Sequence, residues 1–173
     1  MSKTINILIS IDTDAVQVRY PNGSKDSNRP TGIAHDMGYM VATGTTINSG
    51  QGTGNLNITA LVGDTVRAFA VSGSDNFEDA VLLYGMPRFR GTEVFGPFNY
   101  QNFTKSAVFP QSTSTPLPAR IADEEFWFYQ ASVSRRGTEG YKVEFGLYTR
   151  SETTGRPELF GYYDWDPEIT VAG

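Results

Sequence analysis

The sequence predicts an all-β protein, an antiparallel β-sandwich or jelly roll with long loops. Three observations lead to this prediction. Several segments alternate apolar and polar residues, no segment keeps a helical apolar period over two turns, and 18 glycines and 9 prolines interrupt nearly every segment. About nine short strands without helical crossovers favour antiparallel pairing. The 173 residues fit a single domain, which we assign to residues 1–173.

The first predicted strand begins the chain. Ile5, Ile7, Ile9 and Ile11 alternate with other residues, and β-branched side chains at a period of two are typical of a strand with one buried face. A polar segment with proline and glycine, residues 21–32, follows and predicts a long loop. No helix is predicted anywhere in the chain.

The middle of the chain predicts two further core elements. Residues 56–62 alternate, Gly63-Asp64 forms a turn, and residues 65–71 read as the partner strand of a hairpin. Residues 80–84 form a short continuous apolar run, which predicts a strand buried on both sides.

The C-terminal part predicts a second hairpin, with arms at residues 126–133 and 141–148. In the second arm, Tyr141, Val143, Phe145 and Leu147 are expected to face the core. A last aromatic strand covers residues 159–165, and residues 169–171 are expected to pair at a sheet edge. Residues 99–123 carry the weakest pattern and predict an exposed excursion.

Composition and charge exclude several classes of function. The formal net charge of −5 repels polyphosphate backbones and anionic membrane surfaces, so neither nucleic acid nor membrane is an expected partner. The absence of cysteine excludes disulfides, zinc-cysteine sites and thiol catalysis. No apolar run reaches the length of a signal peptide or a membrane span, and a cytoplasmic location is the simplest expectation.

The sequence gives no catalytic apparatus and implies no cofactor. His35 is the single histidine, and neighbouring Asp36 is poorly placed to orient its ring. No Gly-x-Ser-x-Gly motif supplies a nucleophile, so we predict that the protein is not an enzyme. The glycine-rich stretch at residues 50–55 precedes a predicted strand, not a helix, and is expected to be a hairpin loop and not a phosphate cradle.

Two acidic clusters are weak candidates for calcium, which prefers several converging oxygen ligands. Neither cluster matches the twelve-residue calcium loop, and turns or strand-end caps explain Asp and Asn equally well at such places. A pair of these carboxylates in a metal-assisted hydrolase is a more distant alternative. The candidates are Asp12, Asp14, Asp75, Glu78 and Asp79.

Aromatic residues gather near the C-terminus, where Tyr162 and Tyr163 cannot both point inward from one strand. One of them must therefore meet solvent, another strand or a partner, as in a subunit contact or a surface that stacks on a sugar. Loops from the same chain, residues 21–34 or 99–123, are the alternative cover. The candidate ligand or interface residues are His35, Asp36, Asn76, Tyr162, Tyr163 and Trp165.

Six segments together resemble the AidA/PixA family of bacterial quorum-regulated and inclusion-body proteins. They are ILISIDT (7–13), PTGIAHDMGYMVATG (30–44), GQGTGNLNI (50–58), VGDTVR (62–67), NFEDAVLLYG (76–85) and YYDWDP (162–167). The resemblance implies a cytoplasmic protein whose expression follows cell density, linked to host interaction and in some members to dense intracellular inclusions. It carries no catalytic or ligand residues to transfer to this chain.

These observations predict a non-enzymatic protein that acts by self-association or binding, with a two-fold dimer as the expected assembly. The alternative is a lectin-like module that binds a carbohydrate or another small ligand, with or without calcium.

Overall fold

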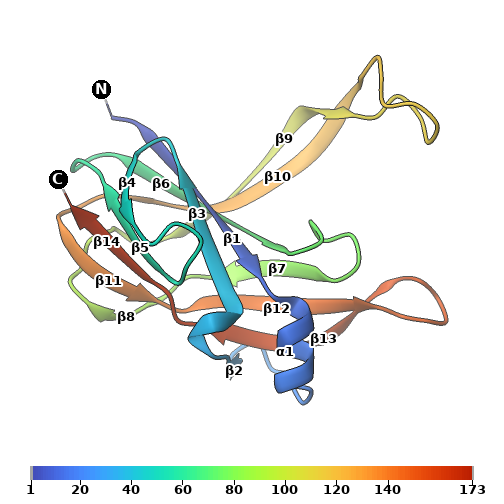
Figure 1. The fold of residues 1–173 in the computed structure, drawn as a ribbon, viewed down its shortest axis with the longest axis horizontal. Coiled ribbons are helices and arrows are strands. Elements are labelled where there is room, and N and C mark those ends of the chain that lie inside the picture. The colour runs from blue at the N-terminus through green and yellow to red at the C-terminus, as the bar shows by residue number, and fades with distance from the viewer. Residues whose placement is uncertain (1, 173) are drawn as a thin grey trace.

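The computed structural model describes residues 2–172 of the chain. The strands form three sheets, and the fold is all-β as predicted (Figure 1). The first sheet has the order β3 (Gly38–Thr43), β1 (Thr4–Ile11), β6 (Thr65–Ser72), β10 (Arg120–Ser132) and β9 (Asn99–Phe109). The second has the order β4 (Thr46–Ser49), β5 (Asn55–Thr59), β14 (Glu168–Ala172), β11 (Gly137–Tyr141) and β8 (Arg88–Gly91). The third has the order β2 (Thr31–Gly32), β13 (Pro157–Trp165), β12 (Val143–Arg150) and β7 (Ala80–Gly85).

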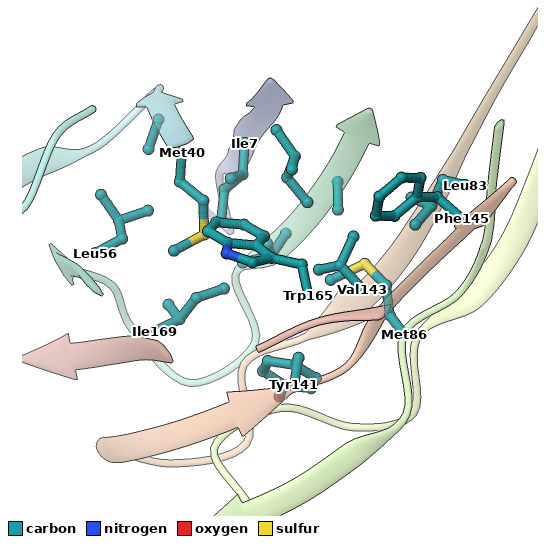
Figure 2. Packing of buried hydrophobic residues seen from close by; sticks show 14 of the residues in the cluster. Ile7, Met40, Leu56, Leu83, Met86, Tyr141, Val143, Phe145, Trp165 and Ile169 are labelled. Atoms are coloured by element: carbon teal, nitrogen blue, oxygen red, sulfur yellow. The ribbon is translucent and has the colours of Figure 1, made fainter. Parts of the chain in front are cut away.

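One apolar core lies between the three sheets. Trp165 has no exposed surface, and Figure 2 shows its indole among Met40 of the first sheet, Leu56 of the second and Val143 of the third. Burying large aromatic side chains is the dominant favourable contribution to such a core, at about 25 cal/mol per Å² of apolar surface.

Strand β1 forms as its pattern predicts. Ile5, Ile7, Ile9 and Ile11 are each at most 1% exposed, while Leu8 on the opposite face is 42% exposed. The pairing of β1 differs from a simple meander, because it runs antiparallel to β3 and parallel to β6. Parallel pairs also join β14 to β5 and β13 to β2, so the sheets are mixed and not purely antiparallel.

A short helix, α1 (Thr13–Arg19), follows β1, and a 3-10 turn, η1 (His35–Met37), precedes β3. The prediction that the chain has no helix is therefore wrong. Asp12 caps α1 by accepting a hydrogen bond from the Ala15 backbone N–H at 2.9 Å, and Val16 is fully buried. A seven-residue helix is too short to show an apolar period over two turns, so only its cap could have indicated it. No helix within residues 2–172 is long and apolar enough to cross a membrane.

Both predicted hairpins are wrong, although their strands exist. Strand β5 pairs with β4 and β14, and β6 pairs with β1 and β10. Strand β12 pairs with β13 and β7, and not with β10. The segments after β5 and after β10 cross to other sheets, which local turn signals do not reveal.

The inward faces of these strands agree better with the sequence. Tyr141, Val143, Phe145 and Leu147 are all at most 2% exposed, as their alternation predicts. On β7, Leu82 is 42% exposed, so this strand is not buried on both sides. Strand β14 lies between β5 and β11, not at a sheet edge.

The weakest sequence pattern lies at residues 99–123, where the sequence predicts an exposed excursion. Residues 99–109 form β9 and residues 120–123 begin β10, and the two strands pair in continuous register from Asn99↔Gln130 to Phe109↔Arg120, joined by an exposed loop at residues 110–119. Figure 1 shows that this pair projects far from the other strands, and we call it the arm. The prediction of an exposed excursion is confirmed, and the paired strands on either side of the loop are a feature that the sequence pattern does not predict.

Candidate functional site

The two acidic clusters meet in space. Asp12 and Asp14, at the start of α1, line one cleft together with Glu78 and Asp79 from the loop before β7. Asp12 is engaged as the helix cap, and Asp79 accepts a hydrogen bond of 2.6 Å from the Gln17 side chain. Within residues 2–172, no group of three or more Asp, Glu or His side chains is placed to hold one metal ion. Asp75 lies elsewhere, with a left-handed φ of 56°.

His35 lies in η1 and contacts two other parts of the chain, the turn after β13 and the glycine-rich loop. Its Nδ1 lies 3.1 Å from the carbonyl oxygen of Asp166, and its own carbonyl oxygen accepts the Trp165 indole N–H at 2.9 Å. A Cβ on Gly54 would lie 2.5 Å from His35 Nε2, so the glycine-rich loop packs directly on this ring. Asp36 instead pairs with Arg19 at 3.3 Å on the surface.

The other candidate interface residues also hold the fold. Tyr163 and Trp165 have no exposed surface, and the Tyr163 hydroxyl donates to the carbonyl oxygen of Tyr20 at 2.8 Å. The segment that follows α1 therefore covers this part of β13. In this conformation, the buried Tyr163 and Trp165 side chains cannot contact a partner. Tyr162 points to the other face and packs edge-on against Tyr84, with ring centroids 5.6 Å apart.

Asn76 organises a turn. Its Oδ1 accepts hydrogen bonds from the backbone N–H of Ser72 at 3.0 Å and of Val81 at 2.9 Å. It adopts a left-handed φ of 60°, which asparagine tolerates better than most residues. Its amide oxygen is therefore committed to joining the end of β6 to the start of β7.

The arm carries several large apolar side chains that are exposed. Phe126 and Trp127 are each 39% exposed near its base, and Val108 reaches 72% further out. Both faces of the two-stranded ribbon are affected, because successive residues of a strand point to opposite sides. The exposed apolar residues of the arm and its terminal loop are Tyr100, Phe103, Val108, Leu117, Ile121, Phe126 and Trp127.

A cleft separates the base of the arm from the body of the protein, and we call it the arm-base cleft. Strand β10 pairs with β6 only over Tyr129–Ser132, so the two strands diverge beyond this point. Phe69 of β6 and Phe128 of β10 pack across its floor with ring centroids 5.1 Å apart. The lining residues are Ala68, Phe69, Ala70, Val71, Asp75, Asn76, Leu83, Glu124, Glu125, Phe126, Trp127 and Phe128.

A second concave site, which we call the aromatic pocket, lies where β7, β8, β10 and β11 meet. Its volume of about 410 Å³ lies in the range of small-ligand sites. Tyr141 and Phe98 pack edge to face in its wall, with ring centroids 5.1 Å apart. The apolar lining residues are Met86, Pro87, Phe95, Pro97, Phe98, Tyr129 and Tyr141.

Glu139 holds the wall of the aromatic pocket in place. Its buried carboxylate accepts the backbone N–H of Val94 at 2.6 Å and of Phe95 at 2.9 Å, and Arg88 lies 3.5 Å from its other oxygen. Burial raises the pKa of Tyr141, and the neighbouring charge of Glu139 adds to this effect. The Tyr141 hydroxyl is buried and has no hydrogen-bond partner among residues 2–172.

Sequence reasoning missed both the arm and the aromatic pocket. The available signal for the arm was the β-branched and aromatic content of residues 99–109, which favours a strand even without one buried face. No comparable signal exists for the pocket, because Phe95 and Phe98 lie in an irregular segment that only tertiary contacts position.

Comparisons with known proteins agree with the family resemblance. The family model described as PixA, inclusion body protein, matches residues 3–171. The chain is similar to the crystal structure of an inclusion body protein (PixA) from Burkholderia cenocepacia J2315, with 29% identity and a TM-score of 0.78. That match covers 99% of this chain and 97% of the other. A search of curated proteins gave no match.

Proposed function

The chain belongs to the PixA family of inclusion body proteins, and we propose that it acts by self-association, with the arm as its main contact surface. A cytoplasmic location, expression that follows cell density and a part in host interaction are further expectations from the family resemblance. The observation that carries the proposal is the exposed apolar surface on both faces of the arm. Contiguous surface of this kind typically marks an interaction site.

The energetics of a two-stranded ribbon support this proposal. An isolated pair of strands is at best marginally stable in water, and three or more strands or a packed face are needed for independent stability. In the arm, residues 104–126 pair with no third strand among residues 2–172. Covering the exposed Val108, Leu117 and Ile121 side chains with a partner would remove apolar surface from water, at about 25 cal/mol per Å².

A role without catalysis is part of the same proposal. Its support is the structural use of the polar residues that could have formed an active site. His35 joins η1, the glycine-rich loop and the turn after β13, while Asn76 joins β6 to β7. His35 Nδ1 and Asn76 Oδ1 bind protein groups in this arrangement.

Sedimentation velocity over a range of concentrations tests the proposal. Val108 and Ile121 face each other across the two strands, so Val108→Thr with Ile121→Thr removes apolar surface and keeps β-branched residues. We expect the wild-type protein to associate at micromolar concentration and this double variant to remain monomeric. Leu61→Thr with Val62→Thr, at an exposed turn outside the arm, is the control and should associate like the wild type. A wild-type protein that is monomeric throughout would refute self-association.

Binding of a small ligand in the aromatic pocket is a second candidate function. The observation that favours it is a preformed concave wall of aromatic side chains, Phe95, Phe98, Tyr129 and Tyr141. A sugar ring presents apolar C–H faces that pack on aromatic rings. Saturation-transfer NMR with a panel of monosaccharides tests it. A signal that Phe98→Ala abolishes and Phe77→Ala preserves supports this site, and no signal from any sugar overturns it.

A further inference from the structure

The arm-base cleft contains strand edges without a pairing partner. Strand β6 continues to Ser72, but its pairing with β10 ends at Ala68, so Phe69–Val71 have no strand partner on that side among residues 2–172. On the opposite wall, β10 from Arg120 to Phe128 pairs only with β9. Open edges carry backbone N–H and C=O groups in strand geometry, and they readily pair with another extended segment.

The walls of this cleft are apolar and its rim is acidic. Phe69, Val71 and Phe126 supply apolar surface at the positions where the strands diverge. Asp75, Glu124 and Glu125 lie along the rim. Within residues 2–172, none of these three carboxylates takes part in a salt bridge. An occupant that matches this cleft is therefore an extended, apolar segment without negative charge.

The outer part of the arm has these properties. From Val94 to Ala122 the sequence contains Lys105 and Arg120 and not one Asp or Glu, and Asp123, Glu124 and Glu125 lie beside Thr104–Ser106, at the end of this region nearest the body. Strand β9 is the last strand of its sheet, so its outer edge is open as well. Val108, Leu117 and Ile121 are each more than 60% exposed in this region.

The two basic side chains are available to a second molecule. Lys105 lies opposite Glu124 in the register of its own arm, yet its ammonium lies over the ring of Phe103, 5.8 Å from the centroid. Arg120 lies over Phe109 at 4.9 Å. Neither forms a salt bridge with any of the residues from 2 to 172.

We infer that the outer part of the arm, residues 104–121, docks into the arm-base cleft of a second copy of this chain. This inference rests on the self-association proposed above and names the receiving surface. The basic, apolar arm of one molecule meets the acidic, apolar cleft of the other, and complementary charge favours this partner over a copy of the cleft itself. Each molecule offers both surfaces, so two molecules can exchange arms about a two-fold axis.

Engineered cysteines test this docking directly, because the natural chain contains no cysteine. Leu117→Cys places a thiol at the end of the arm, and Val71→Cys places one in the cleft with little change in side-chain volume. The two single variants are mixed under mild oxidation, and disulfide-linked dimers are followed on non-reducing gels. Mass spectrometry of the linked peptides then identifies the pair of residues.

Docking raises the effective concentration of one thiol near the other, so the mixed dimer should form at least about tenfold faster than a random pair. The matched control mixes Leu117→Cys with Val18→Cys, whose residue is 81% exposed on α1 and lies outside the cleft. Equal rates for the two mixtures, in a wild-type protein that does associate in sedimentation, overturn this docking and leave self-association standing. A wild-type protein that does not associate overturns both.

Discussion

The ring of Tyr163 fills the space that a side chain on Gly23 would need. A Cβ built on Gly23 would overlap the Tyr163 hydroxyl, while that hydroxyl holds the carbonyl oxygen of Tyr20 at 2.8 Å. The polar segment after α1 is therefore a fitted cover of β13, although its sequence is typical of a loose loop.

We expect Gly23→Ala to lower the free energy of unfolding by about 1–3 kcal/mol, because the added methyl group overpacks a fully buried ring. Gly73→Ala is the matched control, since a Cβ there would meet nothing within 4 Å. Urea titration of both variants measures the difference. Equal stability of the two would show that the cover shifts freely and does not hold Tyr163.

Replacing Phe145, which has no exposed surface, by alanine should cost about 3–5 kcal/mol of stability. Lys142→Ala should cost about 1–3 kcal/mol, although its outward position in the sequence pattern suggests a negligible cost. The reason is Asp164, whose carboxylate is mostly buried and lies 2.5 Å from the Lys142 ammonium. Glu158→Ala, at an exposed position of β13, should change stability by less than about 0.5 kcal/mol. Denaturant titration ranks the three variants, and a Lys142 variant as stable as that of Glu158 would contradict the role of the ion pair.

Asp64 should make the fold sensitive to acid. Burial opposes its charged form, but hydrogen bonds from the backbone N–H groups of Leu61 and Lys3, both 2.9 Å, outweigh burial and lower its pKa. A lowered pKa stabilises the fold above the unfolded value of about 4, and this stability is lost as pH falls through the folded pKa. We therefore expect Asp64→Asn to be less stable at pH 6 and to lose less stability between pH 5 and 3. Urea titrations at these pH values measure the free energy of unfolding. An equal loss of this free energy between pH 5 and 3 in the wild type and in the variant would exclude Asp64 as the cause.

Chelation should leave the melting temperature unchanged. Asp12 and Asp79, the engaged members of the acidic cleft, hold a helix cap and the Gln17 side chain, so neither offers both oxygens to an ion. Differential scanning calorimetry with EDTA or with calcium measures this. A loss of more than about 5 °C with EDTA, on the order of 1 kcal/mol for a domain of this size, would make the cleft a calcium site.

Removing residues 104–125, which include the outer part of the arm and the Glu124 and Glu125 side chains of the arm-base cleft, should abolish association and leave the fold intact. A variant in which an Asn-Gly turn joins Phe103 to Phe126 keeps the register, because these residues are opposite partners. Residues 104–125 contribute nothing to the main apolar core cluster. We expect a folded monomer with a melting temperature close to that of the wild type, measured by circular dichroism and sedimentation. An unfolded product would mean that the arm supports the core.

The sequence predicts the faces of strands better than their partners. β1 and β12 carry alternation that survives in the structure, because one face of each is buried whatever strand lies beside it. Pairing of β1 with β6, or of β14 with β5, joins distant segments, and no local turn records it. The strands of the arm are not predicted because both faces of the arm are exposed. No buried face therefore imposes an alternation of apolar and polar residues on residues 99–109.

The candidate site residues show the same division. The sequence identifies Tyr163, Trp165 and His35 as unusual, but their partners, Tyr20 and Asp166 among them, become visible only in the fold. Most of the residues that the sequence suggests for a ligand or partner surface instead make contacts within the fold. The surface itself consists of residues such as Val108 and Trp127 that ordinary strand composition does not distinguish.

Asp123, Glu124 and Glu125 follow one another on β10, and these three acidic residues affect how an assembly of this protein can grow. Two such rows side by side would repel, so identical molecules cannot stack symmetrically through this edge. A contact between unlike surfaces has a head and a tail, and a linear series built from it always keeps one unused end of each kind. Unless two molecules form a closed dimer, such a series has no fixed number of molecules. Its length then depends on protein concentration.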